Sequence, residues 1–187
     1  GGQQSLEWAM RYPGMMKKCI VMAAGPRLSA QGLGFNAVAR HAIMHDENFA
    51  GGEYYGNAKG PDHGLAVARM LAHITYLSGK GMDLKFGRDR LESNDSRQGF
   101  GTEFMVESYL AHQSKTFIER FDANSYLYIT RAMDYYDAAA NWGNGNLKAA
   151  CERIKAELLV ASFSSDWLYP PEECKEFVNA LLSTNRP

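Results

Sequence analysis

Two short apolar runs constrain this chain more than any other feature, because they stand far apart with only helical patterns between them. The first run is Lys18–Ala24 and the second is Glu157–Phe163. Runs of this length and composition are typical of parallel strands that are buried on both faces. Two strands do not form a stable sheet alone. We therefore expect an α/β fold, a partial doubly wound core whose remaining strands lie outside these 187 residues.

The stretch between the two runs is predicted to be helical. Predicted helices cover Ser29–His45, Gly64–Leu77, Thr102–Glu119, Ser125–Ala139 and Leu147–Lys155, with breaks at Gly51-Gly52, Ser93–Asp95 and Gly143–Gly145. One further helix precedes the first run, over Ser5–Tyr12, and another follows the second, from Pro171 to Leu182. The order strand, long helical insertion, strand, helix favours a helical cap inserted between two parts of a core.

Composition and charge exclude several classes of protein. The chain is 45% hydrophobic and 22% charged with a formal net charge of -1, which is ordinary for a globular domain and gives no electrostatic surface for nucleic acid or an anionic membrane. No apolar run approaches the roughly 20 residues of a membrane span. The three cysteines, Cys19, Cys151 and Cys174, are widely spaced. That spacing favours inert thiols in a reducing compartment, so we expect a cytoplasmic protein.

The two ends of the chain hold candidates for a serine-dependent active site. Gly1 and Gly2 run directly into a predicted helix. In α/β-hydrolases the nucleophile stands on a G-x-S-x-G turn between a strand and a helix, and the acid and the histidine follow later in the chain. Gly1 fits the last glycine of such an elbow. Asp166 follows the second apolar run and fits the triad acid, and no histidine follows it. By position alone, an Asp at this point is more often a turn or capping residue than a catalytic one.

Two further patterns contain residues that bind substrates or metals in other proteins. Arg69, His73 and Tyr76 have the i, i+4, i+7 spacing of one helix face, which also fits a solvated arginine beside a packed tyrosine and a structural histidine. His41 and His45 have the spacing of two zinc ligands. Because no third ligand is evident near them, we expect no metal site.

Motifs spread along almost the whole chain resemble the homoserine O-acyltransferases, the acetyl- and succinyltransferases of methionine biosynthesis. The segments that carry the resemblance are Gly1–Ala9, Arg27–Gln31, Phe35–Arg40, Ala68–Met70, His73–Ser78, Lys85–Arg88, Val106–Leu110, Arg120–Leu127, Ala132–Asp137 and Ser162–Trp167. The Arg-Phe-Asp-Ala-Asn-Ser-Tyr-Leu block and the Ser-Asp-Trp segment are the most specific of these.

The resemblance implies an α/β-hydrolase fold and a particular reaction. A triad serine would take the acyl group from acyl-CoA, and the hydroxyl of L-homoserine would then attack the acyl-enzyme, with acetyl-CoA favoured over succinyl-CoA. Asp166 would be the triad acid, Arg69 would grip the amino-acid carboxylate, and Tyr76 would donate a hydrogen bond to substrate. No bound cofactor is implied. A homodimer through the cap helices is expected.

The resemblance also implies a domain division and a missing part. Residues 1–26 and 157–187 would belong to the core, and residues 27–156 would form the helical cap. The nucleophilic serine, the oxyanion-hole residue after it and the Gly-His-Asp segment of the family are absent, so we expect an internal fragment that is inactive alone. A serine esterase of the same fold and a non-catalytic helical association module are the alternatives.

Overall fold

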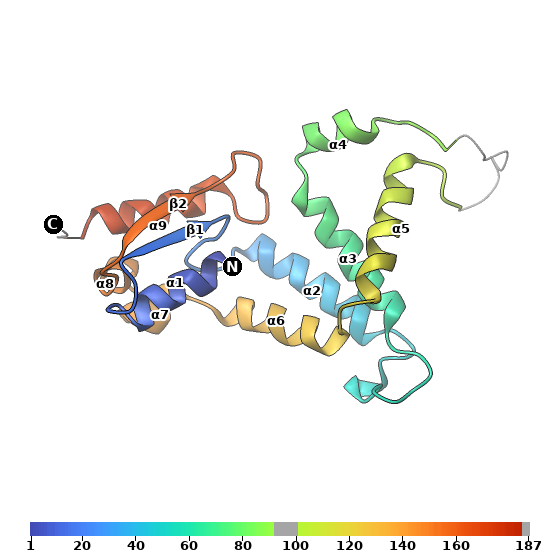
Figure 1. The fold of residues 1–187 in the computed structure, drawn as a ribbon, viewed down its shortest axis with the longest axis horizontal. Helices are drawn as coiled ribbons and strands as arrows, with labels where there is room; N and C mark the ends of the chain where they lie inside the picture. Colours follow the sequence, from blue (N-terminus) through green and yellow to red (C-terminus); the bar gives the residue numbers. More distant parts are fainter. Residues whose placement is uncertain (92–100, 185–187) are drawn as a thin grey trace. The chain divides into compact units, whose positions relative to one another are not determined.

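A computed structural model describes residues 1–91 and 101–184, so the predicted break at Ser93–Asp95 lies outside the described residues. The elements are α1 (Gly2–Arg11), β1 (Lys18–Met22), α2 (Ala30–Met44), the 3-10 turn η1 (Ala50–Gly52), α3 (Asp62–Tyr76), α4 (Gly79–Phe86), α5 (Met105–Ile118), α6 (Ala123–Tyr135), α7 (Ala138–Gly143), α8 (Leu147–Glu152), β2 (Glu157–Ala161) and α9 (Pro171–Leu182) (Figure 1). They form two compact units. We call 1–34 with 129–187 the sheet unit, and 35–128 the helical unit.

Most predicted elements are confirmed within a few residues, but α4 and α7 were not predicted. The sequence of α4 contains two glycines, which weaken a helical pattern. It forms because the Ser78 side chain accepts a hydrogen bond from the Gly81 N–H at 2.9 Å. The predicted helix Ser125–Ala139 ends earlier, at Tyr135, because Asp137 caps a new helix through the Ala140 N–H at 3.0 Å.

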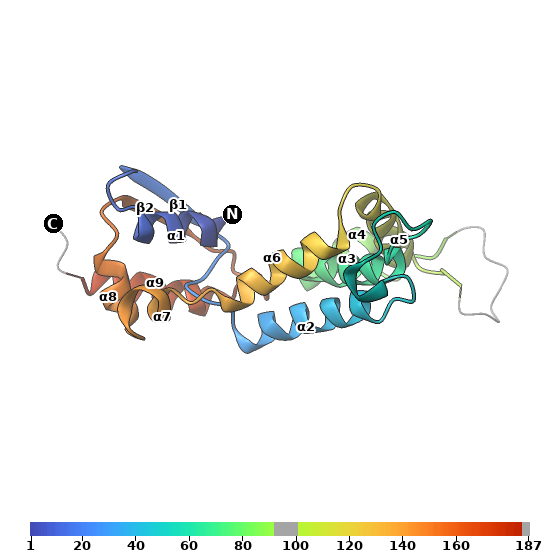
Figure 2. The same ribbon diagram turned by 90° about the horizontal axis from the view of Figure 1, so that it is seen from below.

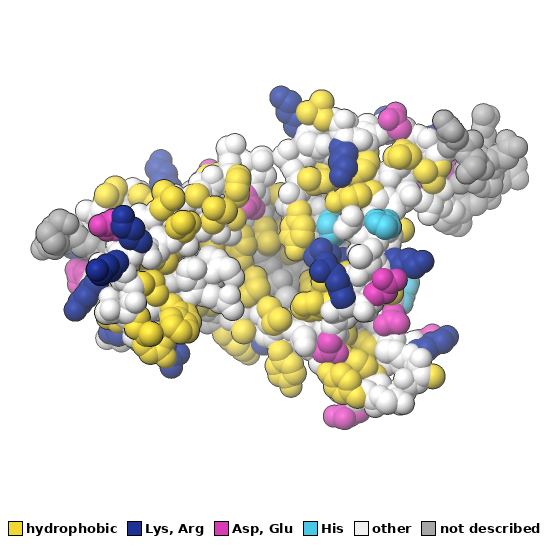
Figure 3. All heavy atoms as spheres, in the orientation of Figure 1, with side chains coloured by type: hydrophobic (Ala, Val, Ile, Leu, Met, Phe, Trp, Pro, Cys, Tyr) yellow, Lys and Arg dark blue, Asp and Glu magenta, His cyan; other side chains and the backbone are white. Residues whose placement is uncertain are grey.

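The two strands pair in parallel, as predicted, from Lys18 opposite Glu157 to Met22 opposite Ala161. Their carboxyl ends therefore lie at one edge of the sheet. The expectation that both faces are buried is wrong for the described chain. Cys19 and Val21 are buried, whereas Ile20 and Met22 are more than half exposed. The reason is that α1, α7, α8 and α9 all cover the same side of the sheet (Figure 2), and hydrophobic side chains remain visible on the surface of the sheet unit (Figure 3).

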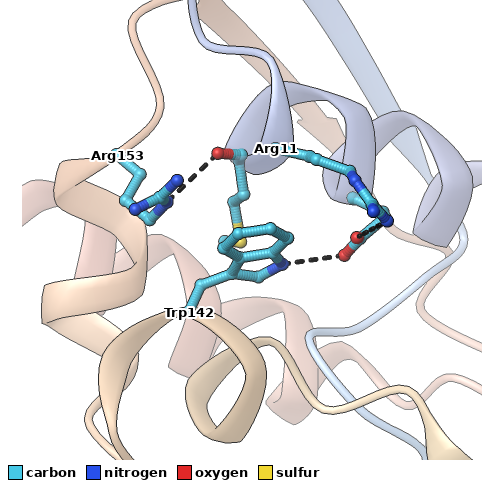
Figure 4. Close-up of polar contacts among 5 residues, drawn as sticks. Arg11, Trp142 and Arg153 are labelled. Atoms are coloured by element: carbon cyan, nitrogen blue, oxygen red, sulfur yellow. Dashed lines mark hydrogen bonds and ion pairs between the residues drawn. The ribbon is translucent and has the colours of Figure 1, made fainter.

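Helix α1 is held tightly in the sheet unit. A Cβ atom at Gly2 would lie 2.5 Å from the Ala24 Cβ and 2.8 Å from the Met22 carbonyl oxygen, so only glycine permits this approach of α1 to the end of β1. At the other side of α1, the Trp142 indole N–H donates to Glu7 Oε2 at 2.8 Å, and the Arg153 guanidinium lies 4.6 Å from the Trp142 ring (Figure 4). These contacts fix the helix that begins at Gly1 and Gly2.

The helical unit has its own core around α3 and α5. It contains buried apolar side chains of α2, α3 and α5, among them Ile43, Leu65 and Phe117. Helix α3 begins against α2 so closely that a Cβ at Gly64 would lie 2.4 Å from the Ala42 carbonyl oxygen. Glycine is thus required by packing at this position.

A loop before α3 is tied to the start of α6 by a hydrogen-bonded network in the helical unit. The Tyr54 hydroxyl donates to Asp122 Oδ1, the Tyr55 hydroxyl donates to Oδ2 at 3.2 Å, and the Ser125 N–H donates to Oδ2 at 2.7 Å. Burial raises the pKa of the Asp122 carboxyl, but the bonds from Tyr54 and Ser125 outweigh it and hold that pKa below its ordinary value. The network therefore stabilises an ionised carboxylate.

No helix within residues 1–91 and 101–184 has the length and apolar composition needed to cross a membrane.

Candidate active site

The parallel sheet brings the glycines before α1 and the loop of Asp166 to the same edge. Gly2 packs against Met22 and Ala24 at the carboxyl end of β1. Asp166 lies in the loop that leaves the carboxyl end of β2 and leads to α9. Ligands of open α/β sheets bind outside the carboxyl ends of the strands. This edge of the sheet is therefore the candidate active site.

Asp166 uses one carboxylate oxygen to shape its own loop. Oδ1 accepts hydrogen bonds from the Leu168 N–H at 3.0 Å and the Tyr169 N–H at 2.9 Å. This is the local turn geometry that its position alone suggested. No residue in the described ranges donates a hydrogen bond to Oδ2. A carboxylate with one oxygen fixed by the backbone and the other unoccupied is suited to orient a histidine.

A pocket of about 690 Å³ opens beside this edge of the sheet. It is lined by the first turns of α1, the end of β1, the second half of α6 and the loop after β2, through Gly1–Gln4, Glu7, Trp8, Met22–Ala24, Ile129, Ala132, Met133, Tyr136 and Tyr169. Asp166 does not line the pocket, but Tyr169, whose N–H it holds, does. Gln3 Nε2 and the Tyr136 hydroxyl are buried here with no hydrogen-bond partner among the described residues. The pocket is thus largely apolar with two unsatisfied polar groups.

Backbone strain marks the same edge. Ala23, directly after β1, has a φ of 46°, which L-residues other than glycine rarely adopt, and its N–H donates to the Ala161 carbonyl at 2.9 Å. A left-handed conformation costs an alanine roughly 1–2 kcal/mol. Strain of this kind clusters at functional sites.

Arg69 and Tyr76, the predicted substrate-binding pair, meet on α3 in the helical unit. Arg69 Nη1 donates to the Tyr76 hydroxyl at 3.4 Å, and the guanidinium lies 4.5 Å from the centre of the Phe117 ring. Nε of Arg69 is buried without a partner, and no acidic side chain of the described residues forms an ion pair with it. The guanidinium is therefore held by aromatic contacts and is available for an anionic ligand.

The histidines do not form a metal site in the described part of the chain. His73 is 8% exposed and its Nδ1 lies 3.1 Å from the Tyr109 hydroxyl. Burial, followed by the positive charges of Arg69 and Lys85, lowers its pKa, so it is neutral and packed. The His41 and His45 rings lie 3.8 Å apart, and His45 Nδ1 is hydrogen-bonded to the His41 carbonyl. Across the described ranges no group of three or more potential ligands occurs.

The cysteines are all free and buried, namely Cys19, Cys151 and Cys174. Burial raises the pKa of the Cys19 and Cys174 thiols, which is the opposite of what an activated nucleophile needs.

Two contacts near Arg69 were not found from the sequence. Phe117 provides the ring beneath the guanidinium, although it lies on a different helix and no spacing connects it to Arg69. Tyr126 on α6 is partly buried, and this burial, followed by the charge of Tyr76, raises its pKa to about 12, while Arg69 and Arg40 act in the opposite direction. Only a three-dimensional structure reveals this grouping.

Comparison with known proteins gives the fold first. The chain superposes on a homoserine O-acetyltransferase from Bacillus anthracis with a TM-score of 0.84 at 22% identity, covering 97% of this chain and 48% of that one. It superposes on the esterase E22 with a TM-score of 0.80 at 27% identity, covering 99% of this chain and 50% of that one. The chain thus has the α/β-hydrolase type of fold.

Sequence relatives then give the family. The chain is 50% identical over 186 residues to the homoserine O-succinyltransferase of Acidithiobacillus ferrooxidans and 51% identical over 187 residues to that of Cupriavidus taiwanensis. All of this chain is covered, and it spans about half the length of these relatives, 48% and 47%. No protein-family model matches it. The resemblance found from the motifs is confirmed, since the chain is similar over its whole length to homoserine O-acyltransferases.

Proposed function

We propose that the protein containing this chain transfers an acyl group from acyl-CoA to the hydroxyl of L-homoserine. The observation that carries the proposal is the meeting of Gly1–Gly2 and the Asp166 loop at the carboxyl edge of one parallel sheet. A serine on an elbow whose last glycine is Gly1, and the acid of its triad, need this placement. The names and full-chain similarity of the relatives support the substrate.

Within this proposal each site residue has a stated task. Asp166 orients the triad histidine, which takes a proton first from serine and then from homoserine. Gly1 is the last glycine of the elbow, and Gly2 lets the start of α1 approach the end of β1. Arg69 holds the homoserine carboxylate through its planar fork, and Tyr76 donates a hydrogen bond to substrate. No bound cofactor takes part, and acyl-CoA is a co-substrate.

The remaining expectations from the sequence enter as parts of the same proposal. Residues 27–156 act as a cap over the core segments 1–26 and 157–187, and cap helices form a homodimer in the cytoplasm. Exposed aromatic side chains on α6, Tyr128 and Tyr135, support a helix-mediated contact.

The acyl donor is addressed by two observations that point in different directions. The described lining of the pocket beside β1 holds no Lys or Arg, which supports acetyl-CoA as donor because a succinyl carboxylate needs a cation. The curated relatives are named succinyltransferases, which supports succinyl-CoA. Values of kcat/KM with both donors decide between them.

A serine esterase is the second candidate, favoured by the similarity to esterase E22. The test is an assay of the whole protein with acetyl-CoA and succinyl-CoA, with and without homoserine. Homoserine-dependent CoA release with formation of an O-acylhomoserine is expected. Hydrolysis of simple esters, together with a rate of CoA release that does not change when homoserine is added, would establish the esterase instead. If the protein shows neither acyl transfer nor ester hydrolysis, the result favours the non-catalytic helical association module.

A further inference from the structure

Four side-chain contacts tie the segment after β1 to the segment that carries Asp166. They are Cys174 Sγ to the Ala24 carbonyl at 3.5 Å, Gln31 Nε2 to the Trp167 carbonyl at 2.9 Å, Arg27 to Glu176 at 3.3 Å, and Glu173 to the Ser29 side chain. All of them lie in the sheet unit at the carboxyl edge. The place of the Asp166 loop therefore depends on side chains outside that loop.

Glu173 differs from the other members of this set because part of its carboxyl group is sealed from solvent. Its Oε2 is buried with no hydrogen-bond partner among the described residues. A Cβ at Gly25 would lie only 3.0 Å from this oxygen, so the backbone after β1 lies directly against the carboxyl. An ionised carboxylate is costly in such a position, whereas the protonated form is tolerated.

The charges around Glu173 act in the same direction as its burial. Asp166 and the neighbouring Glu176 on α9 are negative, and the cation that opposes them, Arg27, is already paired with Glu176. Burial is the main cause that raises the pKa of Glu173, and these two acids add to it, against the Ser29 bond and Arg27. A neutral Glu173 also leaves Asp166 without a repelling charge beside it.

We propose that Glu173 is a positioning residue for Asp166, because its carboxyl, with one oxygen sealed against the backbone at Gly25, fastens the loop after β1 to the first turn of α9. The inference rests on the proposed function, since it assigns Asp166 to the triad. It adds a residue that touches neither substrate nor the reacting atoms. A neutral side chain of the same shape suits the sealed position of Oε2, so we expect Gln to replace Glu173 and Ala not to.

The test uses the whole protein and three variants. Glu173→Ala is expected to lower kcat about 10- to 100-fold, because a small displacement of a catalytic group has effects of that size. The kcat of Glu173→Gln is expected to stay within about threefold of the wild-type kcat. Glu172→Ala, which removes an exposed acid from the same turn of α9, is the matched control and should leave kcat unchanged. Thermal denaturation of each variant shows whether it is folded.

The pH profile separates positioning from mere stability. As pH rises, Glu173 ionises, so the kcat of wild type should fall relative to that of Glu173→Gln, which cannot ionise. A constant ratio, a Gln variant as impaired as the Ala variant, or an Ala variant with normal kcat would each overturn the inference. Asp166→Asn is run in parallel. If it retains activity, the proposed function is wrong, whereas its inactivity beside a normal Glu173→Ala refutes only the role of Glu173.

Discussion

The two units of this chain differ in how their partly buried carboxyl groups are hydrogen-bonded, and therefore in the direction in which the pKa of each group is shifted. In the helical unit, Asp46 and Asp122 each accept backbone N–H bonds, and both carboxyls have a pKa below the ordinary value despite their burial. In the sheet unit, Glu173 keeps an unpartnered buried oxygen and its pKa is raised. The helical unit thus fixes its loops with carboxylates that hydrogen bonds stabilise in the charged form. In the sheet unit, the carboxyl of Glu173, which fastens the Asp166 loop, is favoured in the neutral form.

The same contrast holds for apolar surface. The helical unit closes a core between α2, α3, α5 and α6, while the sheet unit leaves one face of its parallel strands uncovered in the described structure. Core closure is a local property of the helical unit. The sheet unit instead brings the left-handed Ala23, the unpartnered Gln3 and Tyr136 side chains and a pocket together at one edge, which is the pattern of a site for chemistry. We therefore expect substitutions in the sheet unit to act on kcat and those in the helical unit to act on substrate use or stability.

The largest expected effect is that of Asp166→Asn in the whole protein. Asn keeps the shape but leaves the histidine in the wrong tautomer, so kcat should fall about 10⁴-fold in both half-reactions. Steady-state kinetics and the burst of CoA release measure this. Asp62→Asn, which makes the same change at an exposed acid of the helical unit, is the control and should be neutral. If kcat falls less than tenfold in Asp166→Asn, the expectation that substitutions in the sheet unit act on kcat is wrong.

Arg69→Lys tests the expectation that substitutions in the helical unit act on the use of substrate. Lysine keeps the charge but loses the fork that fits a carboxylate, and a charged hydrogen bond of this kind is worth about 1.5–3 kcal/mol. The kcat/KM for homoserine should fall roughly ten- to hundredfold. The burst of CoA release without homoserine should stay normal. Arg88→Lys, another cation near an aromatic ring of this unit, serves as control. A collapsed burst with unchanged use of homoserine would contradict the assignment.

Gly64→Ala should weaken the helical unit without touching catalytic groups. The added methyl would overlap the α2 backbone at Ala42, and overpacking of this kind costs about 1–3 kcal/mol. Gly34→Ala on α2 is the matched control, because a Cβ there meets nothing within 4 Å and alanine favours a helix by about 0.5–1 kcal/mol. Urea denaturation should therefore show shifts of opposite sign, and shifts of equal sign would refute the packing argument.

The smallest expected effect is a change in the acid sensitivity of the helical unit. Because folding lowers the pKa of Asp122, its stabilising contribution is present above the pKa of the unfolded chain and is lost as pH falls through the folded value. Asp122→Asn should flatten the acid limb of the unfolding free energy. Glu47→Gln, the same kind of change at an exposed acid of this unit, should leave that limb as it is. The prediction fails if both variants keep the wild-type slope.

The fold could be predicted from the sequence where periodicity and local chemistry agree. The parallel pair β1 and β2 followed from two apolar runs, and α9 begins at Pro171 as its proline and acids indicated. The short helix α4 could not be found in this way, since its glycines hide a pattern that a serine cap rescues. Burial of both sheet faces was a wrong expectation, because it depends on what covers the sheet.

The candidate site was only partly accessible from the sequence. Arg69 and Tyr76 share a helix face, so their spacing already predicted that they meet. Phe117 reaches the guanidinium from another helix, and Glu173 reaches Ser29 across the fold. Such contacts between distant segments leave no local pattern in the sequence. The resemblance of motifs located the residues, but it did not reveal the contacts that hold them.

The register of the parallel strands also has a consequence for the order in which the protein folds. Lys18 pairs with Glu157, so β1 cannot find its partner until the whole helical unit has been synthesised. The helical unit is continuous in sequence and can fold first, since contacts close in sequence form faster than distant ones. Until β2 emerges from the ribosome, α1 and β1 expose the apolar side chains that later form their core. Slow translation between these segments should therefore promote aggregation of the nascent chain.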